Sequence, residues 1–267
     1  MRLELRPSEG GKTVIYGLYL STAGMEANEY RQNVLANNLA NAETYGFKHD
    51  LAVFSQRPTA SRVAPGGMRF VHPVLDGMSG GLTTKPTYHA HVQGSIEHTD
   101  QPLDVAIEGD GFFAIRDGDR VRFTRDGRMT FNADGEMVLA AGGGRLRVLD
   151  QGGAPIRRIE GGPEARIDGD GVVRQGDLEI GRLGVTSFAD LDRLTKVGRN
   201  LFEAGDEPAI PPQGRIIPQA LERSTFDPVT GLVSMIEAQR AYELNARVLS
   251  LQDESMGEAI NRVGRVA

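Results

Sequence analysis

Both ends of the chain carry a long stretch that suits a single helix with one narrow apolar stripe. The N-terminal stretch covers residues 15–38 and contains no Pro. Its stripe, spaced by three and four residues, consists of Leu20, Ala23, Ala27, Tyr30 and Val34. This spacing predicts a helix about 36 Å long whose stripe forms the seam of a helix–helix contact.

The C-terminal stretch has the same character. Asp227 and Pro228 are typical of an N-cap followed by the first residue of a helix, and residues 229–262 would extend for about 51 Å. Its stripe consists of Leu232, Met235, Tyr242, Ala246, Leu249, Met256, Ile260 and Val263. Asn37 in the first stretch and Gln239 and Asp253 in the second are polar. They either fix register and partner number or are simply exposed to solvent.

The middle of the chain differs in composition from the two ends. It holds most of the 34 glycines, and Asp-Gly recurs seven times between residues 76 and 171, beside short apolar or alternating runs. Asp-Gly in that setting predicts β-hairpins, because both central turn positions need a positive φ. Residues 101–221 are therefore predicted to form an antiparallel β domain. Residues 46–100 are predicted to be an extended linker, since four prolines between 58 and 86 bar long helices. The fold class is α+β.

Composition excludes several kinds of protein. The net charge of −6 argues against a general nucleic-acid binder, and the absence of Cys excludes disulfides and cysteine nucleophiles. No apolar run is long enough to span a membrane. Residues 12–23 are similar to a signal peptide. The region before them should be basic but contains Glu4 and Glu9, so we expect no cleavage.

Two patterns could belong to an enzyme. Ser79 lies in a G-x-S-x-G pattern, yet no helix-forming sequence follows it, and a glycine-rich loop is the simpler interpretation. His89, His91 and His98 could bind zinc, but a strand with solvated histidines is the simpler interpretation. A Ser- or metal-dependent hydrolase stays as a remote alternative. We expect no catalytic residue, no metal and no cofactor.

A third pattern is harder to explain locally. Three Asn, at 37, 38 and 41, close the first helical stretch, and Gly46, Phe47 and Lys48 then begin an extended segment. Helix termination explains Asn41 and Gly46. It does not explain two Asn on the helix itself, where Asn is a poor helix former.

These residues resemble the axial proteins of the bacterial flagellum, the rod and hook family. Residues 37–48 match the N-terminal motif of that family, and residues 18–25 are similar to its opening stretch. Residues 99–113 resemble its central motif, and residues 124–127 its next hairpin. Residues 237–243 with Asn245 look like its C-terminal motif.

The resemblance implies a structural subunit that assembles without catalysis. Its two terminal helices, at 15–45 and 222–264, would pair as a coiled-coil-like domain and pack with neighbouring subunits into a tube. The β domain would form an outer layer. The expected assembly residues are Leu20, Ala27, Tyr30, Val34, Asn37, Asn38, Leu39, Asn41, Gly46, Phe47, Lys48, Leu232, Met235, Gln239, Arg240, Tyr242, Asn245, Ala246, Leu249 and Met256.

Within the family, residues 224–229 and the C-terminal residues from Asp253 resemble the proximal rod branch more than the distal rod branch, which is the alternative. Family members usually begin near Tyr16, so residues 1–13 are extra and suggest a start codon assigned too far upstream.

The resemblance also implies where the chain works and with what. The expected partners are other rod subunits, neighbouring axial proteins and the flagellar type III export apparatus, with no nucleic acid and no membrane insertion. The expected location is the basal-body rod in the periplasmic space, reached by export without a cleaved signal peptide.

Overall fold

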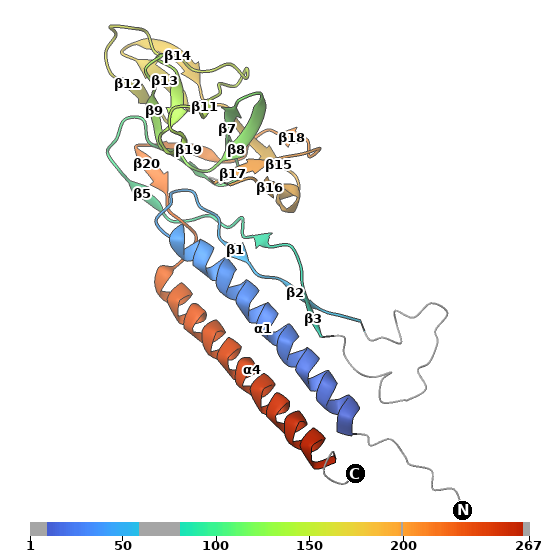
Figure 1. Cartoon of the computed structure of the whole chain (residues 1–267). Helices are drawn as coiled ribbons and strands as arrows, with labels where there is room; N and C mark the ends of the chain where they lie inside the picture. Colours follow the sequence, from blue (N-terminus) through green and yellow to red (C-terminus); the bar gives the residue numbers. More distant parts are fainter. Residues whose placement is uncertain (1–9, 59–80, 199, 264–267) are drawn as a thin grey trace, which may run out of the picture. The chain divides into compact units, whose positions relative to one another are not determined.

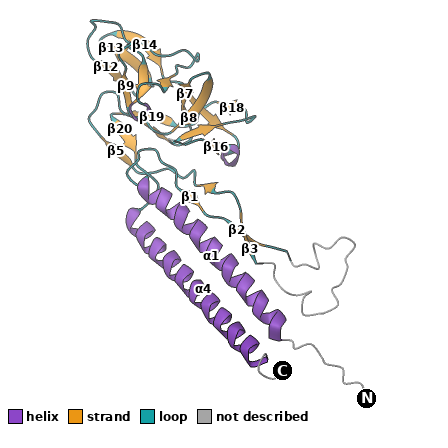
Figure 2. Cartoon of the chain, in the orientation of Figure 1, coloured by secondary structure: helices purple, strands orange, loops and turns teal. Residues whose placement is uncertain are grey.

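The computed structural model of the chain describes residues 10–58, 81–198 and 200–263. Ser79 and most of the N-terminal extension therefore lie outside the described residues. The chain divides into two compact units. The helical unit comprises Met1–Asn37, Asp50–Tyr88 and Val229–Ala267, and the β unit comprises Asn38–His49 and His89–Pro228. Helices and antiparallel strands confirm the predicted α+β class (Figure 2).

The helical unit is built on two long helices, α1 (Gly10–Ala40) and α4 (Pro228–Val263), which lie side by side in Figure 1. Compared with the helices predicted at 15–38 and 229–262, α1 is longer by seven residues and α4 by two. A Cβ placed on Gly17 would lie 2.6 Å from Gln252 Nε2, and one on Gly24 would lie 3.0 Å from Asn245 Oδ1. Because the paired residue numbers run in opposite directions, the helices are antiparallel. The two glycines let the helix backbones approach closely.

The side of α4 that is covered follows a regular spacing of three and four residues. It consists of Gly231, Met235, Ala238, Tyr242, Asn245, Leu249, Gln252 and Met256, all buried or partly buried. This line shares Met235, Tyr242, Leu249 and Met256 with the predicted stripe, whereas the predicted Leu232 and Ile260 are exposed.

Two residues of the predicted stripe of α1 contact a segment of the chain other than α4. Next to α1 lies an extended arm, residues 50–57 and 81–88, in which β2 (Phe54–Gln56) pairs antiparallel with β3 (Leu82–Thr84). The ring of Tyr30 packs edge-on against Phe54 at 6.1 Å, and its hydroxyl donates to Lys85 O at 3.2 Å. Gly81 lies against Ala23. Ala23 and Tyr30 of the predicted stripe therefore contact the arm, and Leu20 of the same stripe is exposed.

The arm begins with β1 (Asp50–Leu51) and ends at β4 (Tyr88–His89).

The β unit contains a sheet of nine strands and several shorter ladders, all antiparallel. The main path of the large sheet is β16-β17-β8-β7-β11-β10-β9, and β15 joins it at β7 and also pairs with β18. Its strands are β7 (Phe112–Asp117), β8 (Arg120–Thr124), β9 (Met129–Phe131), β10 (Met137–Leu139), β11 (Arg147–Val148), β15 (Val185–Phe188), β16 (Thr195–Lys196), β17 (Leu201–Glu203) and β18 (Ala209–Ile210).

Three smaller sheets complete the β unit. One has the order β12-β13-β14, and the other two pair β19 with β6 and β20 with β5. Their strands are β5 (Ile96–His98), β6 (Val105–Glu108), β12 (Ala165–Ile167), β13 (Val172–Gln175), β14 (Leu178–Arg182), β19 (Arg215–Pro218) and β20 (Ala220–Glu222). Two 3₁₀ turns, Ala140–Gly142 and Leu191–Arg193, connect strands.

The larger core cluster of the β unit is mostly aliphatic. Val105, Ile107, Ile115, Leu139 and Leu183 belong to this cluster, and each is almost completely buried. A second cluster combines Phe112, Phe188, Leu194 and Phe202.

The Asp-Gly turns are confirmed in three hairpins. Gly118, Gly135 and Gly171 have φ values of 62°, 72° and 73°, and each lies between two paired strands. Gly127 is different, because its φ is not positive and a Cβ there would collide with Val105 O. Glycine is needed at this position for a close backbone approach.

Candidate assembly surface

The segment after α1 is shaped by its Asn and Gly residues. Thr44 N donates to Asn41 O at 3.0 Å, which closes a turn beyond the end of the helix. Gly46 then adopts a φ of 65°, and a Cβ on it would lie 2.5 Å from Arg125 O. Only glycine fits both the left-handed conformation and this approach. The next two residues, Phe47 and Lys48, are buried within the β unit.

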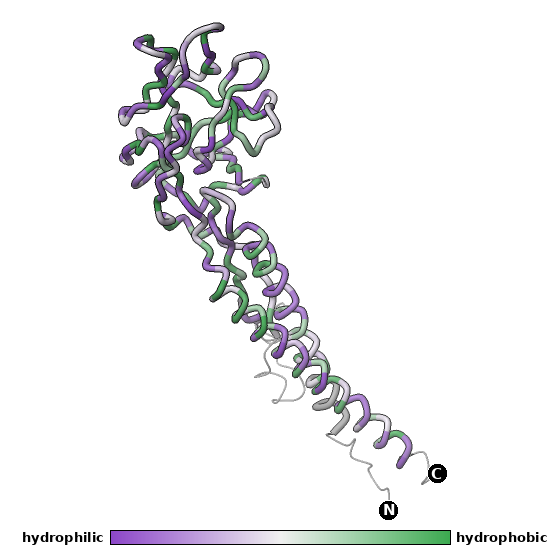
Figure 3. Tube along the Cα trace, turned by 90° about the vertical axis from the view of Figure 1, so that its left-hand side faces the viewer, coloured by the Kyte–Doolittle hydropathy of each residue, from purple (hydrophilic) through white to green (hydrophobic). Residues whose placement is uncertain are grey.

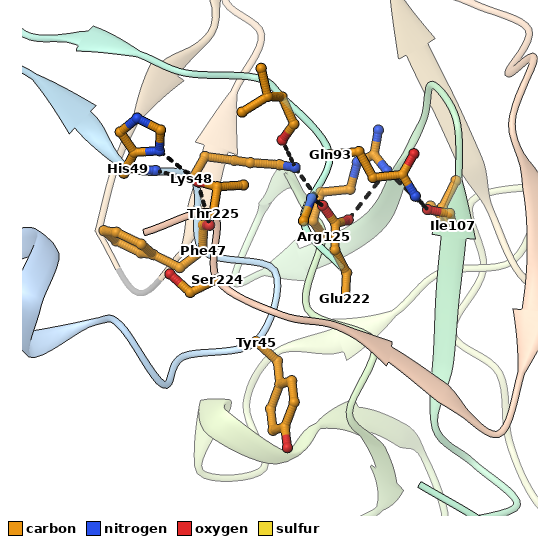
Figure 4. A network of polar contacts seen from close by, with 12 residues as sticks. Tyr45, Phe47, Lys48, His49, Gln93, Ile107, Arg125, Glu222, Ser224 and Thr225 are labelled. Carbon is orange, nitrogen blue, oxygen red and sulfur yellow. Dashed lines mark hydrogen bonds and ion pairs between the residues drawn. The ribbon is translucent and has the colours of Figure 1, made fainter. Parts of the chain in front are cut away.

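Lys48, Arg125 and Glu222 form a buried charge cluster in the β unit (Figure 4). Lys48 Nζ lies 2.5 Å from Glu222 Oε1 and also donates to Val92 O at 2.6 Å. Arg125 approaches the second oxygen of Glu222 at 3.4 Å and donates to Gly109 O at 2.8 Å. The side chains of Lys48 and Glu222 are only 1 % and 0 % exposed.

The cluster contains two cations and one carboxylate. Burial lowers the pKa of Lys48, and the charge of Glu222 opposes that effect. Burial likewise lowers the pKa of Arg125, again against the charge of Glu222. Glu222 Oε1 also accepts a hydrogen bond from Gly94 N at 2.8 Å. Such a cluster is stable only when every member is present, because a buried unpaired charge is costly.

Backbone contacts strengthen the same junction. Gly46 N donates to Glu222 O at 2.6 Å, and Thr225 N donates to Phe47 O at 3.1 Å. The Lys196 ammonium lies 4.0 Å from the centroid of the Phe47 ring. Within the β unit, the segment that follows α1 is thereby held beside the segment that precedes α4.

The histidines that could have bound zinc, His89, His91 and His98, do not form a common site in the described part of the chain. His91 packs its ring against Phe112 and Phe202, and neither ring nitrogen has a hydrogen-bond partner among the described residues. Burial and, next, the charge of His89 lower the pKa of His91 to about 4. His98 lies near Gln219 O at 3.2 Å. In the described part of the chain, no three His, Asp or Glu side chains are grouped as a metal ion requires.

The expected assembly residues fall into three groups. Ala27, Val34, Asn38, Gly46, Phe47 and Lys48 are buried. Those partly buried are Tyr30, Leu39, Asn41, Met235, Tyr242, Asn245, Ala246, Leu249 and Met256. Those exposed are Leu20, Asn37, Leu232, Gln239 and Arg240.

The sequence analysis missed an apolar face on α4. Opposite the side that meets α1, the outer face of α4 exposes Val233, Ile236, Leu244, Val248 and Leu251, each at 43–61 %. Figure 3 shows apolar and polar residues alternating along the two helices. The signal was present in the sequence, since these residues repeat at helical spacing beside the stripe that was chosen. Arg125 and Glu222 were missed because no local pattern links them to Lys48.

Three family models match this chain, one at each helical end and one in the β unit. The family model described as "Flagella basal body rod protein" matches residues 18–48. The "Flagellar hook protein FlgE/F/G D1 domain" matches residues 106–175, and the "Flagellar basal body rod FlgEFG protein C-terminal" matches residues 217–262.

Whole-length relatives agree with the family models. The flagellar basal-body rod protein FlgF of Caulobacter vibrioides is 33 % identical over 252 residues, which cover 93 % of this chain and 98 % of that protein. FlgG of Bacillus subtilis is 29 % identical over 270 residues, covering 93 % and 99 %. The chain belongs to the flagellar basal-body rod family.

The family models match both terminal helices of the fold. The N-terminal family model spans most of α1 and the turn that ends at Lys48, and the C-terminal model runs from β19 through most of α4. The rod family is structural, so the chain is a structural subunit and not an enzyme. Over the described residues, neither long helix is apolar enough to cross a bilayer.

Proposed function

We propose that the chain is a subunit of the proximal rod and that it assembles through its terminal helices into the axial tube that transmits torque. The outer face of α4 carries this proposal. Five large apolar side chains on one side of a helix remain about half exposed in the isolated chain, and such a face is typical of a protein–protein contact. Coiled-coil-like packing between helices of neighbouring subunits would cover it.

The remaining parts fit the same role. The assembly residues on both helices would contact other rod subunits and neighbouring axial proteins, and residues 101–221 would lie outside the helical layer. The charge cluster at Lys48 and Glu222 would keep the segments next to the two helices in fixed positions under load. Export through the flagellar type III apparatus without a cleaved signal, into the periplasmic space, completes the proposal.

The proximal position is favoured by two observations. Residues 224–229 and the C-terminal residues resemble the proximal rod branch, that of FlgF, more than the distal rod branch, that of FlgG. In Caulobacter vibrioides, FlgF is 33 % identical to this chain, whereas FlgG is 28 % identical. The distal rod is the alternative, since relatives named FlgG also match along most of the chain.

Two experiments test the proposal. Leu244→Asp should abolish assembly and motility in the source bacterium, while Val121→Asp, at an exposed residue of the β unit, should leave both intact. Motility that survives Leu244→Asp would refute a role for the outer face of α4. Expression in Caulobacter vibrioides strains that lack FlgF or FlgG tests the position. Rescue of the FlgG strain alone would overturn the proximal assignment.

A further inference from the structure

Two strand edges of the β unit border one cavity. β9 is the last strand on the path of the large sheet, and β12 is an outer strand of the three-stranded sheet (Figure 1). Phe131 of β9 and Ala165 of β12 both line a cavity of about 490 Å³, which we call the edge cavity. All its lining residues belong to the β unit, so the two long helices take no part in it.

The edge of β9 turns backbone hydrogen-bonding groups outward. Alternate residues of an antiparallel strand direct their N–H and C=O groups to opposite edges. Asn132 N donates to Glu136 O at 2.9 Å, on the side of β10. Phe131, the residue before Asn132, therefore directs its N–H and C=O to the open edge. Among the described residues, these two groups have no hydrogen-bond partner.

The edge of β12 follows the same alternation. Asp168 N donates to Val172 O at 2.9 Å, on the side of β13. Ala165 and Ile167 therefore direct their backbone groups away from β13. Within the described ranges, the outward groups of Ala165 have no partner, so each side of the edge cavity offers one free donor and one free acceptor.

A turn at one end of the edge cavity shows how wide the gap between the two edges is. Pro102 O accepts from Ile167 N of β12 at 3.1 Å, and Asp104 forms a β-bridge with Arg128, next to β9. One chain segment thus reaches both edges, and neighbouring strands lie about 4.8 Å apart, so the edges are about 10 Å apart there. An extended residue fills about 160 Å³, given its rise and the spacings of strands and sheets. The edge cavity therefore holds about three residues of one further strand.

A loop, residues 158–164, forms the remaining wall and is held at both ends. Arg158 N donates to Gly135 O at 2.8 Å, in the turn between β9 and β10. Ile159 N donates to Gln175 Oε1 at 2.7 Å, and Gln175 Nε2 donates to Ile159 O at 2.9 Å. Gln175 is buried. Because this wall is already ordered, a ligand does not have to order it on binding.

The charges on the rim favour a basic ligand. The charged side chains that line the edge cavity are Arg158, Glu160 and Glu164, and all three are exposed. The Arg158 guanidinium lies over the Phe131 ring, 6.0 Å from its centroid. Neither glutamate makes an ion pair in the part of the chain that the structure describes. Two carboxylates therefore face one guanidinium that already packs against a ring, and a Lys or Arg side chain complements them.

We propose that the edge cavity binds an extended segment of a partner protein that carries Lys or Arg toward Glu160 and Glu164. The inserted chain pairs with Phe131 on one side and with Ala165 on the other, which is the binding mode of β-strand addition. Main-chain hydrogen bonds supply the affinity, and the two carboxylates select the side chain. Assembly through the terminal helices neither requires this site nor creates it.

Hydrogen exchange of the full-length chain, titrated with the peptide acetyl-Thr-Val-Lys-Val-Thr-amide, tests the site. At a peptide concentration of ten times Kd, the amides of Phe131 and Ala165 should exchange about tenfold more slowly. The same peptide with Glu in place of Lys should bind about tenfold more weakly. A Lys peptide that protects neither amide at millimolar concentration, or equal binding of the two peptides, would overturn the proposal.

Charge variants separate recognition from folding. Glu160→Gln and Glu164→Gln in one chain should weaken binding of the Lys peptide about fivefold and leave binding of acetyl-Thr-Val-Thr-Val-Thr-amide unchanged. Glu179→Gln, exposed in the same unit but outside the edge cavity, should change neither affinity. A double variant that binds the Lys peptide as tightly as the wild type would contradict the proposal. Protection of both amides that rises with protein concentration without peptide would assign the edge cavity to a second copy, and would overturn it as well.

Discussion

Loss of the single carboxylate in the buried cluster should destabilise the β unit strongly. Glu222→Gln keeps the shape of the side chain and an acceptor oxygen but removes its charge. Lys48, with its side chain only 1 % exposed, would then be buried without its counter-charge, and Arg125, 6 % exposed, would keep only the charge of Asp110. Breaking a buried ion pair by removing one partner typically costs about 3–5 kcal/mol.

The assay should report on the β unit alone. Hydrogen exchange of the β7 amides, followed in the full-length chain, measures its opening free energy. A cost of about 3–5 kcal/mol corresponds to exchange that is faster by a hundredfold to a few thousandfold. Glu97→Gln is the matched control, because its ion pair with Arg223 is 51–55 % exposed and should contribute less than about 1 kcal/mol.

A third variant separates charge from packing. Replacing all three members, as Lys48→Met, Arg125→Met and Glu222→Leu, should recover much of the lost stability, because it leaves no unpaired charge. Exchange in Glu222→Gln that is no faster than in Glu97→Gln would refute the reasoning. It would mean that the two cations do not depend on Glu222.

Three further outcomes are expected. Gly46→Ala should destabilise the β unit by more than about 2 kcal/mol, since the new methyl group meets backbone atoms, whereas Gly118→Ala has a similar φ but nothing within 4 Å and should cost only about 1 kcal/mol; urea titration compares them. The pKa of His91, about 4 in the folded chain, lies below its usual 6.5, so the unfolded chain binds more protons and stability should fall as the pH drops from 6.5 towards 4. The fall is at most about 3 kcal/mol and should vanish in His91→Phe, with an unchanged pH profile counting against it. Gly24→Leu should separate the two helices and lower helicity by circular dichroism, while Gly257→Ala, with nothing within 4 Å, should raise helix stability by about 1 kcal/mol; equal effects would contradict the close approach.

The sequence predicted the elements well because their signals are local. Apolar spacing of three and four residues predicted both long helices, and Asp-Gly predicted the hairpins at Gly118, Gly135 and Gly171. The same dipeptide at Asp126–Gly127 does not form the predicted turn with a positive φ. Glycine is needed there because Val105 O passes close by.

The candidate site was predicted only in part. Lys48 was singled out through the motif that contains it, but its partner Glu222 is 174 residues away and no sequence spacing connects them. The stripe of α1 was recognised and its partner was not, because Tyr30 contacts Phe54 of the arm.

By itself, therefore, the sequence determined that this protein has two long helices around a β-rich middle, and its motifs pointed to the rod family. Only the tertiary structure decided which helical face is covered by the arm, which meets the other helix and which stays open. The physical reason is that periodicity tells which side chains share a face of a helix. What covers that face depends on chain segments that are distant in sequence.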